Sequence, residues 1–400
     1  MKRFLLLSDI HATDMDPSAW NAPSTVSSKP AKAGTRVEPL ADLEAMLKRE
    51  SRDVDYILCA GDITNKAHPS SLSFAWEKLN ALSEALGAKL IATVGNHDLD
   101  SRYKENAFDP KGYVMALNPP LPTDDRVHYL EYWAENFTLI SEADCNIIVL
   151  NTAAYHGGGQ DGSVEIEHGR ISEMTLNLLE QRLVNTPPAA TNILLCHHHP
   201  IKGDEGDEFA AGPTRGGERL IDILDKSDQP WIVVHGHKHE PELFYGSGGG
   251  NSPVVLACAS FSAQVNVDAR NKNPNQVHLL TCDPGAAAAA SLDVAGTVES
   301  WTWVAGVGWN PARPEQGLPY QTGFGYRASA SKIAKELEEH LSTVPEGRIR
   351  WVDALDKVPT IANLIPRDFE RLKKRLEELD LIVLNDGNTN QPSELGKRHA

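Results

Sequence analysis

Five short apolar segments of this chain each end close to residues that can bind a metal ion, and this arrangement constrains the fold more than any other feature. The segments cover residues 4–7, 56–59, 90–94, 193–196 and 231–234, and have the length and aliphatic content of buried strands. Open α/β sheets bind ligands at the carboxyl ends of such strands. The candidate ligands that follow them are Asp9, His11, Asp62, Asn96, His197, His237 and His239. We therefore expect an α/β fold with a two-metal hydrolytic centre.

Segments with helical periodicity separate these predicted strands. The expected helices cover residues 39–50, 71–86, 172–183 and 219–224. Alternation of strand and helix up to about residue 265 is typical of an α/β layered domain. Further strand-like runs are expected to form a second sheet, and they cover residues 254–257, 277–280 and 298–304.

Two long segments, 13–37 and 99–140, interrupt this alternation and lack a clear period. Both come soon after a metal-binding motif, so we expect two long loops near the site. The second segment contains the aromatic residues Tyr103, Phe108, Tyr113, Tyr129, Tyr132 and Trp133. Such side chains either stack on a nucleobase or anchor the loop, and the sequence supports both interpretations equally.

The chain becomes more helical and more charged after Arg327. Helices are expected over 329–341, 352–362 and 366–379, and the last has a proline in its first turn and an alternating-charge face. A DNA-reading helix is one interpretation, but the charge pattern favours a packing or oligomerisation module. We expect a catalytic domain over 1–326 and a C-terminal helical extension over 327–400, through which subunits could assemble.

Composition restricts the partners and the compartment. The formal charge of -17 argues against nucleic acid as the main partner, because binding to a phosphate backbone relies on Lys and Arg; nucleic acid stays possible but is not favoured. The five cysteines are widely spaced and mostly lie in apolar runs, which indicates a reduced, cytoplasmic protein. The apolar run 4–7 is too short for a signal peptide, and no stretch is long enough to span a membrane.

The motifs combine ligand types that suit a binuclear centre. Asp9 and His11 form a chelating pair two positions apart, and Gly61 allows a tight turn before Asp62, whose carboxylate can bridge two cations. In Gly95-Asn96-His97-Asp98, the amide oxygen can bind a metal and the carboxylate of Asp98 can orient the imidazole of His97. Carboxylate, amide and imidazole ligands together suit manganese, iron or zinc.

In this order, the five motifs resemble those of the calcineurin-like metallophosphoesterase superfamily, and they are closest in style to its bacterial cyclic-nucleotide phosphodiesterase branch. The resemblance covers roughly residues 1–310 and leaves the helical tail outside. It implies a four-layer αββα sandwich. It also implies that Asp9, His11 and His239 hold the first metal, that Asn96, His197 and His237 hold the second, and that Asp62 bridges the two. His197 is preferred over His198 because it comes first after its strand, although the register leaves His198 open.

Two bridged cations can lower the pKa of a shared water and polarise a phosphoryl oxygen. We therefore expect a metal-dependent phosphodiesterase that acts on cyclic or other small nucleotides through a bridging hydroxide. His97, oriented by Asp98, would stabilise the transition state or protonate the leaving oxygen. One alternative is a DNA or RNA nuclease of the same superfamily. Another is a regulatory protein of this fold that binds a partner through its tail.

Overall fold

The computed structural model describes residues 1–35, 37–142, 144–156, 168–203, 212–248, 252–264, 275–327, 329–387 and 391–398. The chain divides into two compact units. One unit comprises Arg3–Leu279 and Trp301–Asn310, and the other comprises Met1–Lys2, Leu280–Ser300 and Pro311–Ala400. The candidate site residues, which lie between Asp9 and His239, all belong to the first unit.

A seven-stranded sheet contains the three parallel strands that precede the first three motifs. These strands are β1 (Lys2–Leu7), β2 (Tyr56–Cys59) and β3 (Lys89–Ala92), and their last residues, Leu7, Cys59 and Ala92, stand opposite one another. The motifs that follow therefore emerge at one edge of the sheet. The order is β12-β11-β10-β1-β2-β3, with β13 paired to β11. The added strands are β10 (Gln276–Cys282), β11 (Gly296–Val304), β12 (Gly308–Pro311) and β13 (Gln321–Phe324).

A six-stranded sheet carries the last two motifs, in the order β4-β5-β6-β7-β9-β8. Its strands are β4 (Phe137–Glu142), β5 (Cys145–Leu150), β6 (Thr191–Leu195), β7 (Trp231–His235), β8 (Glu242–Tyr245) and β9 (Val254–Ala257). β5, β6, β7 and β9 are parallel, and all their residues are buried, as expected of strands covered on both faces.

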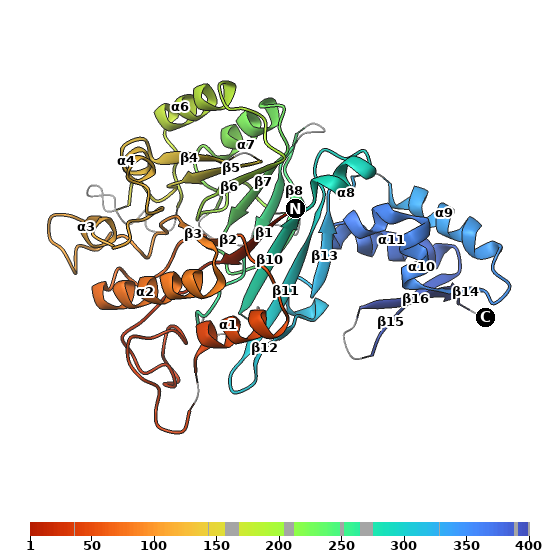
Figure 1. Cartoon of the computed structure of the whole chain (residues 1–400), viewed down its shortest axis with the longest axis horizontal. Helices are drawn as coiled ribbons and strands as arrows, with labels where there is room; N and C mark the ends of the chain where they lie inside the picture. The colour runs from red at the N-terminus through yellow and green to blue at the C-terminus, as the bar shows by residue number, and fades with distance from the viewer. Residues whose placement is uncertain are drawn as a thin grey trace. The chain divides into compact units, whose positions relative to one another are not determined.

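Helices cover the outer faces of both sheets, which gives the four layers αββα (Figure 1). α1 (Pro39–Arg49) and α2 (Pro69–Leu86) cover the first sheet, and α6 (Glu173–Val184) and α7 (Gly217–Lys226) cover the second. The core beneath α6 and α7 includes Leu179, Leu224 and Trp231. The predicted strands and helices of this region and the sandwich are therefore confirmed. The runs 254–257, 277–280 and 298–304 do not form a second sheet of their own, however, because β9 pairs with β7 in the six-stranded sheet, whereas β10 and β11 extend the sheet of β1. No helix within the described ranges is long and apolar enough to cross a lipid bilayer.

The prediction of a long loop over 99–140 is wrong in its second half. After the short helix α3 (Gly112–Met115), this segment forms α4 (Arg126–Glu135) and then β4. The Asp125 carboxylate caps α4 by accepting the backbone N–H of Val127 at 2.7 Å, and β4 pairs antiparallel with β5. Tyr129 and Tyr132 are buried, so these two aromatic side chains anchor the segment. The described residues of 13–37, by contrast, contain only isolated bridges.

The C-terminal residues form helices together with a small sheet that the sequence did not predict. The elements are α9 (Ala330–Ser342), β14 (Arg348–Arg350), α10 (Trp351–Lys357), the 3-10 helix η2 (Pro359–Asn363), α11 (Pro366–Glu378), β15 (Leu381–Asn385) and β16 (Pro392–Lys397). The antiparallel sheet has the order β14-β16-β15, and Leu337, Leu372 and Leu395 lie in the core that its strands share with the helices. This succession is that of a winged helix. Before it come α8 (Pro284–Ala289) and the 3-10 helix η1 (Pro314–Gln316).

Candidate metal centre

Five of the predicted ligands have left-handed backbone conformations. The φ angles are 51° at Asp9, 49° at His11, 52° at Asp62, 74° at His237 and 59° at His239. Residues other than glycine rarely adopt such angles, which cost roughly 1–3 kcal/mol each and persist where the surrounding structure enforces them. Such backbone strain is concentrated at functional sites, so the left-handed φ angles indicate that these five residues are functional.

Asp9, His11 and His239 come together as a first cluster. His239 Nε2 lies 3.2 Å from both Asp9 Oδ1 and His11 Nε2. The Asp9 carboxylate also accepts the backbone N–H of His237 at 3.0 Å, which joins the first motif to the fifth. A Cβ at Gly236 would come within 1.8 Å of Ser8 Oγ, so the close approach of these two loops requires glycine.

His197 and Asn96 form a second cluster with Asp62. His197 Nε2 lies 3.0 Å from Asn96 Oδ1 and 3.4 Å from Asp62 Oδ2. The other ring nitrogen, Nδ1, is 2.7 Å from the carbonyl oxygen of Ala60 and therefore donates its proton there. In the neutral ring, the Nε2 lone pair then faces two oxygen acceptors, an arrangement that a bound cation would stabilise. Burial opposes a positive charge on His197, but Asp62 outweighs this effect and raises the pKa to about 9.

Asp62 connects the two clusters. Its Oδ2 lies 3.5 Å from His11 Nε2 in the first cluster and 3.4 Å from His197 Nε2 in the second. Burial by itself would raise the pKa of Asp62, but the surrounding histidines hold it far below its usual value. The carboxylate is therefore ionised and faces ligands on both sides, which is the arrangement a bridging ligand requires. A Cβ at Gly95 would lie 2.2 Å from Asp62 Oδ1.

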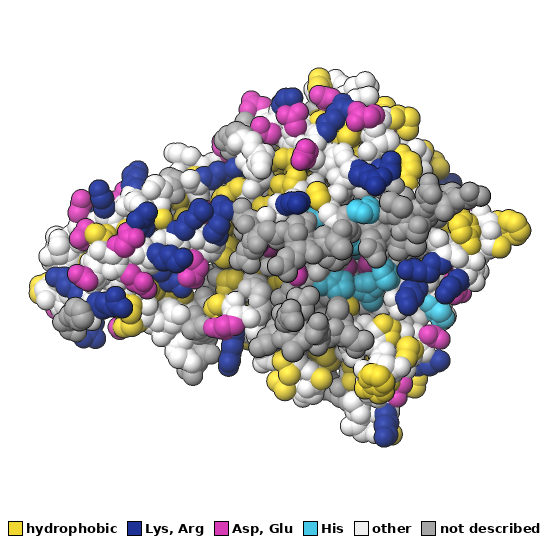
Figure 2. All heavy atoms as spheres, turned by 180° about the vertical axis from the view of Figure 1, so that it is seen from behind, with side chains coloured by type: hydrophobic (Ala, Val, Ile, Leu, Met, Phe, Trp, Pro, Cys, Tyr) yellow, Lys and Arg dark blue, Asp and Glu magenta, His cyan; other side chains and the backbone are white. Residues whose placement is uncertain are grey.

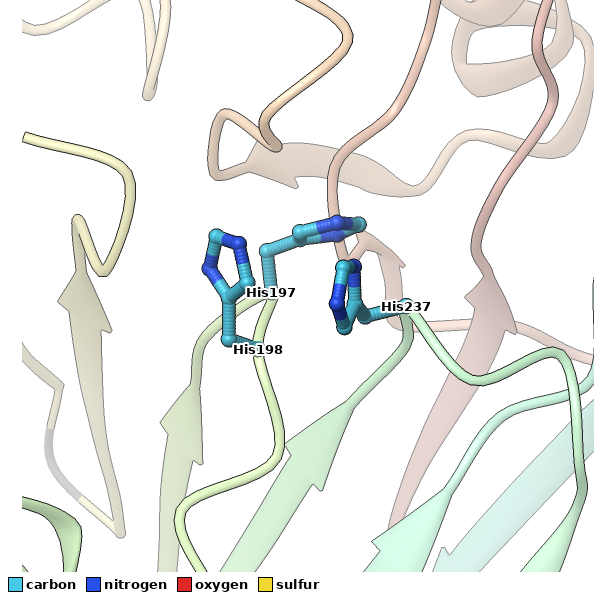
Figure 3. A group of neighbouring side chains, drawn as sticks. All are labelled: His197, His198 and His237. Carbon is cyan, nitrogen blue, oxygen red and sulfur yellow. The ribbon is translucent and has the colours of Figure 1, made fainter. Parts of the chain in front are cut away.

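His198 contacts Thr152, whereas His197 contacts Asn96 and Asp62. Figure 3 shows His197, His198 and His237 as neighbours on the ends of two strands, and their nitrogens could also hold a metal ion together. His198 Nδ1 lies 2.9 Å from Thr152 Oγ1, however, and that hydroxyl also accepts the backbone N–H of His198 at 3.1 Å. His197 is thus the histidine next to the other ligands of its cluster. The rings of His198 and His237 have centroids 4.5 Å apart.

His97 lies beside the first cluster, but Asp98 does not orient it as expected. The Asp98 carboxylate accepts the backbone N–H groups of Thr64 at 2.9 Å and Gly95 at 2.8 Å, because it is turned into the protein. The His97 ring instead places Nδ1 3.1 Å from Asn65 Oδ1. Asp98 therefore fixes the two loops that carry Asp62 and Asn96.

The loop from Asp62 to Ala67 holds His97 at three points. Asp62 Oδ1 accepts the backbone N–H of His97 at 2.7 Å, the carbonyl of His97 accepts the N–H of Ala67 at 2.7 Å, and Asn65 binds the ring. Burial lowers the pKa of His97 to about 3, against the opposing effect of the Asp62 carboxylate. Burial and the neighbouring Asp62 raise the pKa of Asp98 to about 7.

Sequence reasoning did not single out Asn65 or Thr152. Asn65 follows Asp62 by three residues within the same motif loop, so its spacing was a usable signal. Thr152 follows β5, and the pairing of β5 with β6 brings it to His198.

Comparison with known proteins gives two matches to protein families. The family model described as calcineurin-like phosphoesterase matches residues 2–241. A second model, wHTH-Calcineurin_assc, matches residues 322–378, which include α9, α10 and α11.

Individual relatives are more distant. A 3′,5′-cyclic adenosine monophosphate phosphodiesterase from Vibrio vulnificus is 25% identical over 189 residues, which cover 47% of this chain and 56% of that protein. A probable glycerophosphodiester phosphodiesterase from Arcobacter nitrofigilis is 28% identical over 179 residues, 44% of this chain and 62% of that one. The chain thus spans less than two thirds of these relatives. A solved dimetal phosphatase from Danio rerio aligns with 70% of this chain and 92% of its own, at 13% identity and a TM-score of 0.44.

Proposed function

The chain belongs to the calcineurin-like phosphoesterase family, and from this membership we propose that it is a metal-dependent phosphodiesterase acting on cyclic or other small nucleotides. The observation that carries the proposal is the pair of ligand clusters that share the Asp62 carboxylate. The Vibrio relative is a cyclic adenosine monophosphate phosphodiesterase and the Arcobacter relative a probable glycerophosphodiester phosphodiesterase, which supports a diester substrate.

The ligand set fits two divalent cations. Asp9, His11 and His239 would hold one, Asn96, His197 and His237 the other, with Asp62 shared between them. The donors combine oxygen and imidazole nitrogen, which suits manganese, iron or zinc. When bound, such ions lower the pKa of a coordinated water and polarise a phosphoryl oxygen.

Protein groups would position the substrate's departing oxygen. The amide oxygen of Asn65 can only accept a hydrogen bond, so it holds the proton of His97 on Nδ1 and leaves Nε2 to face the site. With a second proton on Nε2, His97 would stabilise charge on the phosphoryl group or protonate the leaving oxygen, while Nδ1 keeps its hydrogen bond to Asn65. Asp98 acts through the backbone of the motif loops and does not touch the His97 ring.

We place catalysis in residues 1–326 and treat 327–400 as a separate module. The five cysteines are free and buried, which supports a reducing, cytoplasmic environment. Basic and acidic residues are equal in number between 327 and 400, and Arg371 and Arg375 on α11 pair with Asp368 and Glu378. This balance supports a protein contact or subunit assembly over nuclease-type DNA binding by the module.

The test is a turnover screen of the purified chain with added manganese. It compares an aryl phosphodiester, an aryl phosphomonoester, cyclic nucleotides and single-stranded DNA. We expect hydrolysis of the aryl diester and of at least one cyclic nucleotide. Activity on the monoester alone would refute the diesterase proposal, and preferred cleavage of DNA would favour the nuclease.

A further inference from the structure

Ser8, the residue before the first metal motif, makes a buried contact with the Asp9 carboxylate. Its Oγ donates a hydrogen bond to Asp9 Oδ2 at 2.5 Å. Such a short distance is typical of a charge-assisted bond between a hydroxyl and an ionised carboxylate. Histidine side chains are visible on the face of the molecule shown in Figure 2, whereas Ser8 and Asp9 are fully buried. Bulk water therefore does not reach Oδ2 to take the place of the Ser8 hydroxyl.

The two oxygens of the Asp9 carboxylate have different surroundings. Oδ2 accepts the Ser8 hydroxyl, and Oδ1 lies 3.2 Å from His239 Nε2 and 3.8 Å from His11 Nε2. The backbone N–H of His237 lies 3.0 Å from Oδ2 and 3.2 Å from Oδ1, so it hardly distinguishes the two oxygens. The bond from Ser8 is therefore the contact that turns Oδ1, rather than Oδ2, toward the other ligands of the first cluster.

The backbone around Ser8 is held independently of this hydroxyl. The carbonyl of Ser8 accepts the N–H of Phe261 at 2.8 Å, and the carbonyl of Asp9 accepts the hydroxyl of Ser260 at 2.7 Å. A Cβ at Gly236 would lie 1.8 Å from Ser8 Oγ and 2.5 Å from Asp9 Oδ2, so this glycine packs directly on the bonded pair. Within the described ranges, the Ser8 hydroxyl bonds only to Asp9. Its loss should therefore affect the carboxylate more than the loop.

We propose that Ser8 is a positioning residue that raises the metal affinity of the first cluster by turning Asp9 Oδ1 toward the ion. This inference rests on the proposed function, in which Asp9, His11 and His239 hold one cation. Without the Ser8 hydroxyl, the carboxylate can rotate about its Cβ–Cγ bond, and Oδ2 competes with Oδ1 for the ion. Removing a group that orients a metal ligand in this way typically lowers the metal affinity about 10- to 100-fold.

The test measures manganese affinity in two backgrounds that each keep one cluster. The double variant Asn96→Ala/His197→Ala keeps the first cluster, and His11→Ala/His239→Ala keeps the second. Affinity is measured by competition with a fluorescent chelator. Adding Ser8→Ala should lower the affinity roughly 10- to 100-fold in the first background. In the second background it should change the affinity less than about threefold, because the Ser8 hydroxyl contacts no ligand of that cluster. In the otherwise wild-type chain, Ser8→Ala should weaken one of two manganese ions.

Two further variants separate positioning from a general structural effect. Ser262 is equally buried, and its hydroxyl donates to the carbonyl of Ile10 at 2.7 Å and not to a ligand side chain. Ser262→Ala should therefore keep the wild-type affinity, and Ser8→Thr, which retains a hydroxyl, should keep most of it. An unchanged affinity of the first cluster in Ser8→Ala, equal losses in both backgrounds, or an equal loss in Ser262→Ala would overturn the inference. A wild-type chain that binds no manganese would instead refute the proposed metal-dependent function.

Discussion

Replacing Asn65 by alanine should impair catalysis through His97 while leaving the metal ligands in place. The hydrogen bond between Asn65 Oδ1 and His97 Nδ1 is 3.1 Å long and partly buried. Neither of its two partners is a candidate metal ligand. A hydrogen bond of this kind is worth roughly 0.5–1.5 kcal/mol. If its loss acts on the transition state alone, kcat should fall roughly two- to tenfold with little change in KM.

The assay is the hydrolysis of methyl aryl phosphates whose phenols span a range of pKa. If His97 serves the leaving oxygen, Asn65→Ala should slow the esters of weakly acidic phenols most. In a double-mutant cycle, Asn65→Ala should cost little once His97 is already alanine. Asn65→Asp, which can also accept the proton of Nδ1, should retain much of the rate. If Asn65→Ala lowers kcat by the same factor in the wild-type chain and in the His97→Ala variant, the reasoning is refuted, because Asn65 would then act independently of the His97 ring.

Three further perturbations test the fold and the module. Ser172→Ala removes the hydroxyl that accepts the backbone N–H of Thr175 at the start of α6, and should lower the free energy of unfolding in urea by about 1 kcal/mol; an unchanged midpoint would exclude a capping role. Leu179→Ala, in the core beneath α6, should lower the free energy of unfolding by roughly 2–5 kcal/mol. A smaller decrease would mean that neighbouring side chains repack into the cavity. Leu372→Ala should destabilise the winged helix while diester turnover continues, whereas parallel loss of turnover would show that catalysis depends on that module.

The sheet and the ligand clusters could be predicted because both follow from local patterns. A short apolar run followed by Asp, His or Asn predicts both a buried strand and a polar group at its carboxyl end. The observed register of β1, β2 and β3 brings those strand ends together. The resemblance to a known family then assigned each ligand to a cluster. His197 and His198 differ by one position, and only the contacts to Asn96 and Ala60 distinguish them.

Other features depend on contacts between distant segments, which one sequence does not display. Asp98 was expected to hold His97 because the two are adjacent, but Asp98 binds the backbone of Thr64 and Gly95, and Asn65 comes across from the second motif. Within 99–140, the prolines and acidic residues resemble those of a loop, so α4 and β4 were not predicted. β4 is stabilised by its pairing with β5, which its own composition does not reveal.

The most direct test of the central claim measures the number of bound metal ions and the rate of diester hydrolysis in the same titration. The chain is stripped with a chelator and titrated with manganese, while bound metal is measured by mass spectrometry and diester hydrolysis by absorbance. The shared position of Asp62 predicts that activity approaches its maximum at two ions per chain, and that Asp62→Ala binds fewer ions and loses turnover. Full diester hydrolysis by the metal-free chain, or two tightly bound ions and wild-type turnover in Asp62→Ala, would contradict the binuclear assignment.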